Sequence, residues 1–257
     1  MLRQIDLRSS RVHSRFQRSN SSASSTEIET AVSAIIRRVQ RQGDAALRYY
    51  SKKFDGAALR SFSVPEKEIL RARKDAEPGF VRLLNEAAGN IRKFHLRQRR
   101  TSWKISDRSG SDLRQRYLPV DRVGVYVPGG KAAYPSTVLM NVIPAQVAGV
   151  ENIVLVSPPD RNGKINADVL TAAALLGIKR IFSVGGAQAI AALAYGTETI
   201  PAVDVVVGPG NIFVATAKKM LFGQVGIDSI AGPSEVVVLA DDSARADFVA
   251  AVLAAQA

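Results

Sequence analysis

Apolar residues in the first half of the chain recur every three or four positions, which is the spacing of amphipathic helices. The predicted helices run from a cap at Ser25 or Thr26 to a turn at Asp55-Gly56, from Pro65 to Ala76, and from Pro78 to about Arg100. Gly43 interrupts the first of these helices. From Leu113 to Val127 the pattern alternates, which predicts two strands separated near Pro119 and Asp121.

The second half contains short, fully apolar runs that alternate with alanine-rich segments. The apolar runs, which predict buried strands, are Val123–Val127, Ile153–Val156, Ile181–Val184, Val203–Val207 and Val236–Leu239. The segments between them, which predict helices, are Ser136–Ala148, Ala167–Leu176, Ala187–Tyr195 and Ile212–Leu221. Buried strands joined by helical crossovers form a parallel sheet covered on both faces. The pattern therefore predicts an α/β fold with a Rossmann-like parallel sheet.

The two ends of the chain carry weaker signals. Residues 1–20 are polar and rich in arginine, which predicts an arm that packs only against something else. A last helix is expected to begin at Ser243, and no glycine, proline or cationic turn ends it before Ala257. We therefore expect the sequence to be cut short within this helix.

Composition excludes several classes of protein. Cysteine is absent from the 257 residues, so disulfides, cysteine-ligated metal sites and a thiol nucleophile are excluded. Its absence also fits a reducing compartment. No run of about 18 apolar residues occurs, so no membrane span is expected. The two histidines, His13 and His95, are not spaced as a metal-binding pair, so this sequence alone cannot build an ordinary zinc site.

The formal net charge is +12, and it is unevenly distributed. Residues 1–120 hold 26 Lys and Arg against 12 Asp and Glu, whereas residues 121–257 hold 9 against 11. A basic region can bind nucleic acid, but no zinc finger, aromatic RNP pair or GXXG loop accompanies this one. We interpret the basic residues between Arg92 and Lys104 as a solvated helix face, and nucleic-acid binding is not expected to be the main function.

Three glycine-rich turns follow predicted strands: Val127–Lys131, Gly185–Gln188 and Gly208–Asn211. Because the carboxyl ends of parallel strands meet at one edge of a sheet, all three turns are expected where ligands bind. Glycine lets backbone N–H groups approach a ligand closely, and a helix N-terminus favours phosphate. One such turn is weak evidence, since tight turns often need glycine for steric reasons. Three at one edge favour a nucleotide or dinucleotide.

Polar side chains adjoin these turns. Gln188 and Asn211 carry amides that can donate and accept hydrogen bonds toward a nucleotide, although Asn211 also suits a helix N-cap. Tyr126 ends a strand beside the first turn, where it can contact the same ligand or be an ordinary core tyrosine. Ser234 lies in a tight turn before Val236, where it can face the same edge or bond its own turn. No general base is placed by the second half of the chain.

Four motifs in the same order make the chain resemble the histidinol dehydrogenases. They are Arg122–Pro144 (RVGVYVPGGKAAYPSTVLMNVIP), Val184–Pro201 (VGGAQAIAALAYGTETIP), Val206–Lys218 (VVGPGNIFVATAK) and Asp228–Leu239 (DSIAGPSEVVVL). The likeness continues more weakly through Gly43–Asp55 (GDAALRYYSKKFD) and covers nearly the whole chain after the first twenty residues. It implies a Rossmann-like cofactor domain of the aldehyde-dehydrogenase type beside a second, incomplete α/β domain.

The resemblance also implies an activity and a set of site residues. The activity is oxidation of L-histidinol through L-histidinal to L-histidine, the last steps of histidine biosynthesis, by cytoplasmic homodimers that use NAD and zinc. Tyr126, Gln188 and Asn211 would contact the cofactor, and Ser234 would contact the substrate. Gln256 would bind both zinc and substrate.

The resemblance divides the chain into parts. They are an arm (1–20), the first part of the incomplete α/β domain (21–125), the cofactor domain (126–235) and a return segment (236–257). The acid–base pair and the other zinc ligands are expected beyond Ala257, so the 257 residues alone are predicted to be inactive and prone to aggregate. Three alternatives stay open: a dehydrogenase of another small alcohol, a nucleotide-binding paralogue without turnover, and nucleic-acid association through the basic half.

Overall fold

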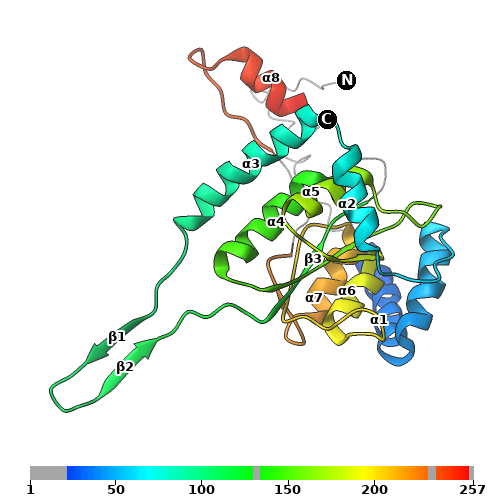
Figure 1. Cartoon of the computed structure of the whole chain (residues 1–257), viewed down its shortest axis with the longest axis horizontal. Coiled ribbons are helices and arrows are strands. Elements are labelled where there is room, and N and C mark those ends of the chain that lie inside the picture. Colours follow the sequence, from blue (N-terminus) through cyan, green and yellow to red (C-terminus); the bar gives the residue numbers. More distant parts are fainter. Residues whose placement is uncertain (1–21, 130–133, 231–235, 255–257) are drawn as a thin grey trace, which may run out of the picture.

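A five-stranded parallel sheet forms the centre of the structure, a computed structural model that describes residues 22–129, 134–230 and 236–254 (Figure 1). Its strands are β3 (Arg122–Tyr126), β4 (Asn152–Ser157), β5 (Arg180–Ser183), β6 (Val205–Val207) and β7 (Gly226–Ile227). They lie in the order β5-β4-β3-β6-β7, and every neighbouring pair is parallel. The predicted α/β fold with a parallel sheet is confirmed.

Successive residues of each strand point to opposite faces of the sheet, so the strands supply two separate cores. Val125 and Leu155 belong to one core, and Tyr126 and Val156 belong to the other. The helices that follow the strands are α4 (Pro135–Ala148), α5 (Ala167–Leu175), α6 (Gly186–Tyr195) and α7 (Ile212–Leu221). Residues of α4 and α5 complete the first core, and residues of α6 and α7 complete the second.

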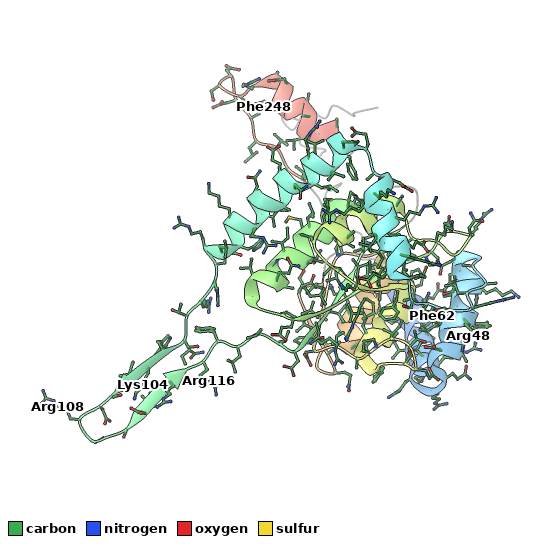
Figure 2. The ribbon with its side chains drawn as sticks, viewed as in Figure 1. Arg48, Phe62, Lys104, Arg108, Arg116 and Phe248 are labelled. Atoms are coloured by element: carbon green, nitrogen blue, oxygen red, sulfur yellow. The ribbon has the colours of Figure 1, made fainter. Side chains whose placement is uncertain are left out.

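Three N-terminal helices form an outer layer: α1 (Ser22–Tyr50), α2 (Glu66–Asp75) and α3 (Pro78–Leu96). Helix α1 packs against α6 and α7, whereas α2 packs against α5 and α3 packs against α4. The link from α1 to α2 runs along strand β5, where the N–H of Val64 donates to the carbonyl of Ile181 at 2.9 Å. Phe62 in this link is buried, and the guanidinium of Arg48 lies 6.0 Å from its ring centre (Figure 2). The link covers a sheet edge that would otherwise expose unpaired backbone groups.

Helix α1 begins earlier than the sequence indicated. It starts at Ser22, so Thr26 lies inside the helix and the predicted cap at Ser25 or Thr26 is wrong. Starting a helix is costly, but adding a turn to an existing helix is not. The packed turns that follow therefore allow the serines to extend the helix. Gly43 interrupts the helix as predicted, with a φ of 47° that only glycine adopts readily.

A two-stranded hairpin projects far from the sheet (Figure 1). It pairs β1 (Trp103–Ser106) with β2 (Asp112–Gln115) in antiparallel register, and every residue of both strands is exposed. Figure 2 places Lys104, Arg108 and Arg116 along this arm. These basic side chains are therefore solvated, but the predicted single helix face is wrong, because α3 ends at Leu96 and Lys104 lies on strand β1.

The predicted strand Val236–Leu239 is wrong. These residues form no strand in the described structure, and Val237 and Leu239 are 84% and 94% exposed. A run of apolar residues forms a strand only where a neighbouring strand offers hydrogen-bonding partners. The fifth strand is instead the two-residue β7, which is too short for any periodicity to be recognised. The last described element, α8 (Ala246–Ala254), buries none of its residues.

Candidate cofactor site

The strand order creates a switch point between β3 and β6, because the helices that follow these two strands cover opposite faces of the sheet. Open parallel sheets bind ligands in the crevice outside the carboxyl ends of their strands at such a point. A cavity of about 610 Å³ opens there. Gly129, Pro158, Gly186 and Asn211, each of which follows the end of a different strand, contribute to its lining. The three glycine-rich turns of the sequence thus meet around one cavity.

Tyr126, the last residue of β3, places its hydroxyl at this cavity. The side chain is 3% exposed, and its hydroxyl oxygen accepts a hydrogen bond from the N–H of Gly186 at 3.2 Å. Burial raises the pKa of Tyr126 to about 12, the bond from Gly186 lowers it, and the nearby charge of Asp55 raises it further. The phenol is therefore a neutral donor whose own proton remains available to a ligand.

The N-terminus of α6 opens onto the same cavity. Its cap residue Gly185 supplies no side-chain hydrogen bond, so the first turn keeps backbone donors that suit an anion. Gly186 has a φ of 67°, and a Cβ there would lie 2.6 Å from Oε1 of Gln188. The Gln188 side chain is 1% exposed and folds over this glycine. Glycine at position 186 is therefore favoured by the left-handed backbone, and its lack of a side chain leaves room for the Gln188 amide.

Asn211 combines the two roles that the sequence left open. Its Oδ1 accepts hydrogen bonds from the N–H groups of Phe213 and Val214, both at 3.1 Å, so it is the N-cap of α7. It also lines the cavity. Within the described part of the chain, Nδ2 of Asn211 has no recorded hydrogen-bond partner, so this amide group is the portion that a ligand can use.

Asp55 is a cavity residue that the sequence interpretation missed. It ends η2 (Ser51–Asp55), a π-helical turn that continues α1 and stops at Gly56, where the chain turns left-handed. The Asp55 carboxylate lines the cavity, and its buried Oδ2 has no hydrogen-bond partner among the described residues. Burial raises the pKa of Asp55 to about 6. The sequence offered only Asp55-Gly56 as a turn, because proximity to Tyr126 is created by the packing of α1 on α6 and α7.

Replacing Asp55 with asparagine is expected to stabilise the fold near neutral pH. The folded state binds a proton at Asp55 more tightly than the unfolded state, so its destabilising effect is present above about pH 6 and absent below about pH 4. At about pH 8 the gain should be about 1 kcal/mol, less than the full pKa shift implies because the carboxylate is partly solvated. Urea unfolding at about pH 8 and about pH 5 measures it, with the exposed Asp75→Asn as control. An equal gain at both pH values would contradict the expectation.

A buried ion pair supports the third glycine-rich turn. Lys218 of α7 is 2% exposed, and its Nζ donates to the carbonyl of Gly208 at 3.0 Å while pairing with the carboxylate of Asp228. The other carboxylate oxygen of Asp228 accepts the N–H of Gly208 at 2.8 Å. Both backbone groups of Gly208 are thus held by one pair, which fixes the loop that presents Asn211.

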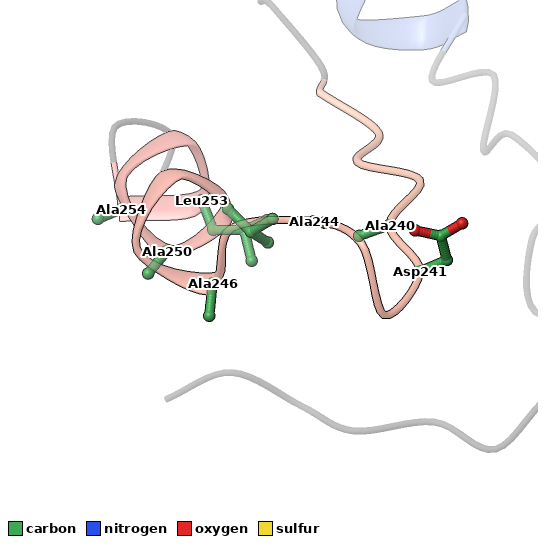
Figure 3. A pocket seen from close by; sticks show the side chains of 8 residues that line it. Ala240, Asp241, Ala244, Ala246, Ala250, Leu253 and Ala254 are labelled. Carbon is green, nitrogen blue, oxygen red and sulfur yellow. The ribbon is translucent and has the colours of Figure 1, made fainter.

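Another hollow, of about 600 Å³, lies between α8 and the loop that precedes it (Figure 3). Alanines form most of its lining, and Asp241 is the single polar residue there. Such a lining offers none of the convergent polar groups that orient a ligand. The cavity at the switch point is therefore the candidate site.

Metal ligands do not gather in the described structure. Residues 22–129, 134–230 and 236–254 contain no group of three or more His, Cys, Asp or Glu side chains able to hold an ion. Ser234 and Gln256, predicted as substrate and zinc contacts, lie outside the described residues. Of the five predicted site residues, the structure brings together Tyr126, Gln188 and Asn211.

Comparison with known proteins gives a consistent result. The family model for histidinol dehydrogenase matches residues 18–257. The chain is 57% identical to the histidinol dehydrogenase of Halalkalibacterium halodurans over 229 residues, which are 89% of this chain and 54% of that protein. It is 56% identical to the enzyme of the same name from Geobacillus kaustophilus over 231 residues, 90% of this chain and 54% of that one.

A solved structure agrees with the sequence comparison. The crystal structure of histidinol dehydrogenase from Elizabethkingia anophelis superposes with a TM-score of 0.84 at 42% identity. The match covers 89% of this chain and 53% of that one. The chain therefore spans about half the length of the relatives that it matches.

Proposed function

The chain belongs to the histidinol dehydrogenase family, and we propose that it supplies the cofactor-binding part of an NAD-dependent oxidation of L-histidinol to L-histidine through L-histidinal. The observation that carries this proposal is the cavity at the switch point, where three glycine-rich turns converge. Bound NAD⁺ would supply the hydride acceptor for both oxidation steps. The residues described here bind and orient that cofactor.

The chemistry of the lining residues fits a dinucleotide. The N–H of Gly186 already donates to Tyr126, so the other N–H groups in the first turn of α6 and the neutral hydroxyl of Tyr126 are the donors suited to phosphate oxygens. The amides of Gln188 and Asn211 can bond to ribose, carboxamide or phosphate groups. Phe54 and Phe213 are 53% and 40% exposed, and as lining residues they offer ring faces against which a base can stack.

Substrate and zinc contacts belong to the proposal on the strength of family membership. Ser234 and Gln256 are proposed to contact L-histidinol, and Gln256 is also proposed as a zinc ligand. One neutral amide is a poor zinc site by itself, and the described residues add no cluster of ligands to it. The acid–base pair and the remaining zinc ligands are proposed to belong to sequence beyond Ala257.

We also propose that the sheet domain is related to the aldehyde dehydrogenases and lies beside an incomplete second domain. We propose further that the protein is a homodimer located in the cytoplasm. Among the helices that the structure describes, none combines the length and the apolar character needed to cross a membrane. Nucleic acid is not proposed as a partner, because Lys104 on the basic arm is paired with Asp112 at 2.8 Å and no recognition motif accompanies it.

NAD⁺ is expected to bind the 257-residue chain, and Gln188→Leu is expected to weaken that binding roughly 3- to 10-fold, the loss of about one hydrogen bond. Leucine keeps most of the volume of the buried side chain, so packing should survive. Isothermal titration calorimetry of both proteins measures the change. The exposed Gln40→Leu is the matched control and should bind NAD⁺ as the wild type does.

Two results would contradict this proposal. Absence of NAD⁺ binding by the folded wild-type chain would remove the cofactor assignment. Formation of NADH from L-histidinol by the 257 residues alone would show that the acid–base chemistry is already present in them. NAD⁺ binding without oxidation of histidinol is the expected outcome, and a comparison of histidinol with other small alcohols in a longer chain separates the alternative substrates.

A further inference from the structure

The usual acidic residue of a dinucleotide-binding sheet is missing from its usual place. In such folds an Asp or Glu near the end of the second strand accepts a hydrogen bond from the adenosine ribose. Here the second strand of the sheet, β4, ends at Ser157 and is followed by Pro158 and Pro159, which line the cavity without offering a carboxylate. The next acid, Asp160, is engaged in its own loop, where Oδ1 accepts the N–H groups of Asn162 at 2.9 Å and Lys164 at 2.8 Å.

Asp55 brings a carboxylate to this place from a different part of the chain. Among the described residues that line the cavity, it is the sole acid, and Lys53 is the sole cation. The cavity extends over the end of β4, which is the side where a dinucleotide-binding sheet holds adenosine. Asp55 lines the cavity, and its Oδ2 is buried without a hydrogen-bond partner in the described structure, so the carboxylate beside the cavity keeps unused acceptor capacity.

We infer that Asp55 accepts hydrogen bonds from the adenosine ribose hydroxyls and thereby makes the site select NAD⁺ over NADP⁺. This inference rests on the proposed function of the cavity. A carboxylate accepts bonds from two neighbouring hydroxyls, whereas it repels a 2′-phosphate of the same sign. The desolvated carboxylate destabilises the unliganded protein, and such a residue is typical of a binding site.

Lys53 is the group that could oppose this selection. An ammonium beside the ribose would attract a 2′-phosphate, but Nζ of Lys53 lies 5.5 Å from the ring centre of Phe54, in the position of a cation over an aromatic face. We therefore expect Lys53→Met to leave the preference for NAD⁺ at or above its wild-type value. A preference for NAD⁺ that fell in Lys53→Met while staying at the wild-type value in Asp55→Asn would assign the selection to Lys53 and overturn the role of Asp55.

The experiment measures the dissociation constants of NAD⁺ and NADP⁺ for the 257-residue wild type, Asp55→Asn and the surface control Asp75→Asn. Loss of a hydrogen bond to a charged group is expected to weaken NAD⁺ binding by Asp55→Asn roughly 10- to 100-fold. NADP⁺ binding should change little or improve, so that the NAD⁺ to NADP⁺ ratio approaches about 1. Asp75→Asn should keep the wild-type ratio. Circular dichroism checks that each variant is folded.

The outcomes separate this inference from the proposed function. If the wild type binds NAD⁺ and Asp55→Asn keeps the wild-type ratio, the inference is overturned while the cofactor site stands. This includes the case in which both affinities fall equally, which would place Asp55 at the nicotinamide ribose. If the wild type binds neither dinucleotide, the proposed function fails together with the inference.

Discussion

The substitution Gly208→Ala is expected to lower the free energy of unfolding by about 4 kcal/mol, although it adds only one methyl group. This is the largest loss of stability that we expect from any of the substitutions. Gly208 has a φ of 111°, where a residue with a Cβ is strained. A Cβ at this position would also collide with the carbonyl oxygen of Tyr126 on the neighbouring strand. Backbone atoms of a central strand cannot move aside as a flexible side chain can, so the two strands would have to separate.

Comparison with a second glycine of similar φ separates the backbone strain from the collision with Tyr126. Gly223 has a similar φ of 99°, and a Cβ there would meet no atom within 4 Å. Gly223→Ala should therefore cost only the backbone strain, about 1 to 2 kcal/mol. Urea unfolding of both variants measures the difference. Equal destabilisation would mean that the contact with Tyr126 relaxes freely, and the close packing of β3 and β6 would not be the reason for glycine at 208.

Removing the carboxylate of Asp228 is expected to destabilise the fold by about 3 kcal/mol, more than removing its partner Lys218. The asymmetry follows from burial, because the Lys218 side chain is 2% exposed and that of Asp228 is 33% exposed. Asp228→Ala leaves a buried ammonium whose remaining acceptor is the carbonyl of Gly208. Lys218→Met removes the buried charge itself and leaves Asp228 with solvent and the N–H groups of Gly208 and Ser229. That change should cost about 1 to 2 kcal/mol.

The adjacent lysine is the control for this pair. Lys219 pairs with Glu29 at 3.2 Å, but both side chains are largely exposed, at 60% and 43%. Lys219→Met should change stability by less than about 0.5 kcal/mol. Combining Lys218→Met with Asp228→Ala should restore part of the stability lost in Asp228→Ala alone. If Asp228→Ala costs no more than Lys219→Met, the pair does not hold the turn at Gly208.

Both predictions concern the loop that presents Asn211 to the cavity. Gly208 closes the end of β6, and Asn211 follows it as the cap of α7. A variant that loosens this loop without unfolding the protein should also weaken NAD⁺ binding. Comparing the loss of stability with the loss of affinity in Lys218→Met tests whether the pair fixes the site as well as the fold.

Periodicity was sufficient for the elements that are long or fully buried. The apolar runs of β3, β4, β5 and β6 and the alanine-rich helices between them were recognisable because each repeats one pattern over several residues. The glycine-rich turns were recognisable for a related reason, since glycine marks backbone conformations that other residues avoid. Tyr126, Gln188 and Asn211 could be selected because they adjoin those turns in the sequence.

Short or unpartnered segments were not recognisable in this way. Val236–Leu239 has the composition of a strand but no neighbour that pairs with it in the described structure, whereas Gly226–Ile227 pairs with β6 although it has no pattern. Strand formation at these positions depends on what lies beside the backbone. Composition does not contain that information.

The sequence by itself determined the fold class, the alternation of strands and helices and the three turns of the candidate site, because these depend on residues close together in the chain. The tertiary structure alone decided the strand order, the switch point, the membership of Asp55 in the site and the support that Lys218 gives to the turn at Gly208. Asp55 lies 71 residues before Tyr126 in the numbering, and it reaches the cavity only because α1 packs on α6 and α7. Contacts of this kind arise from the packing of whole elements, which no local pattern encodes.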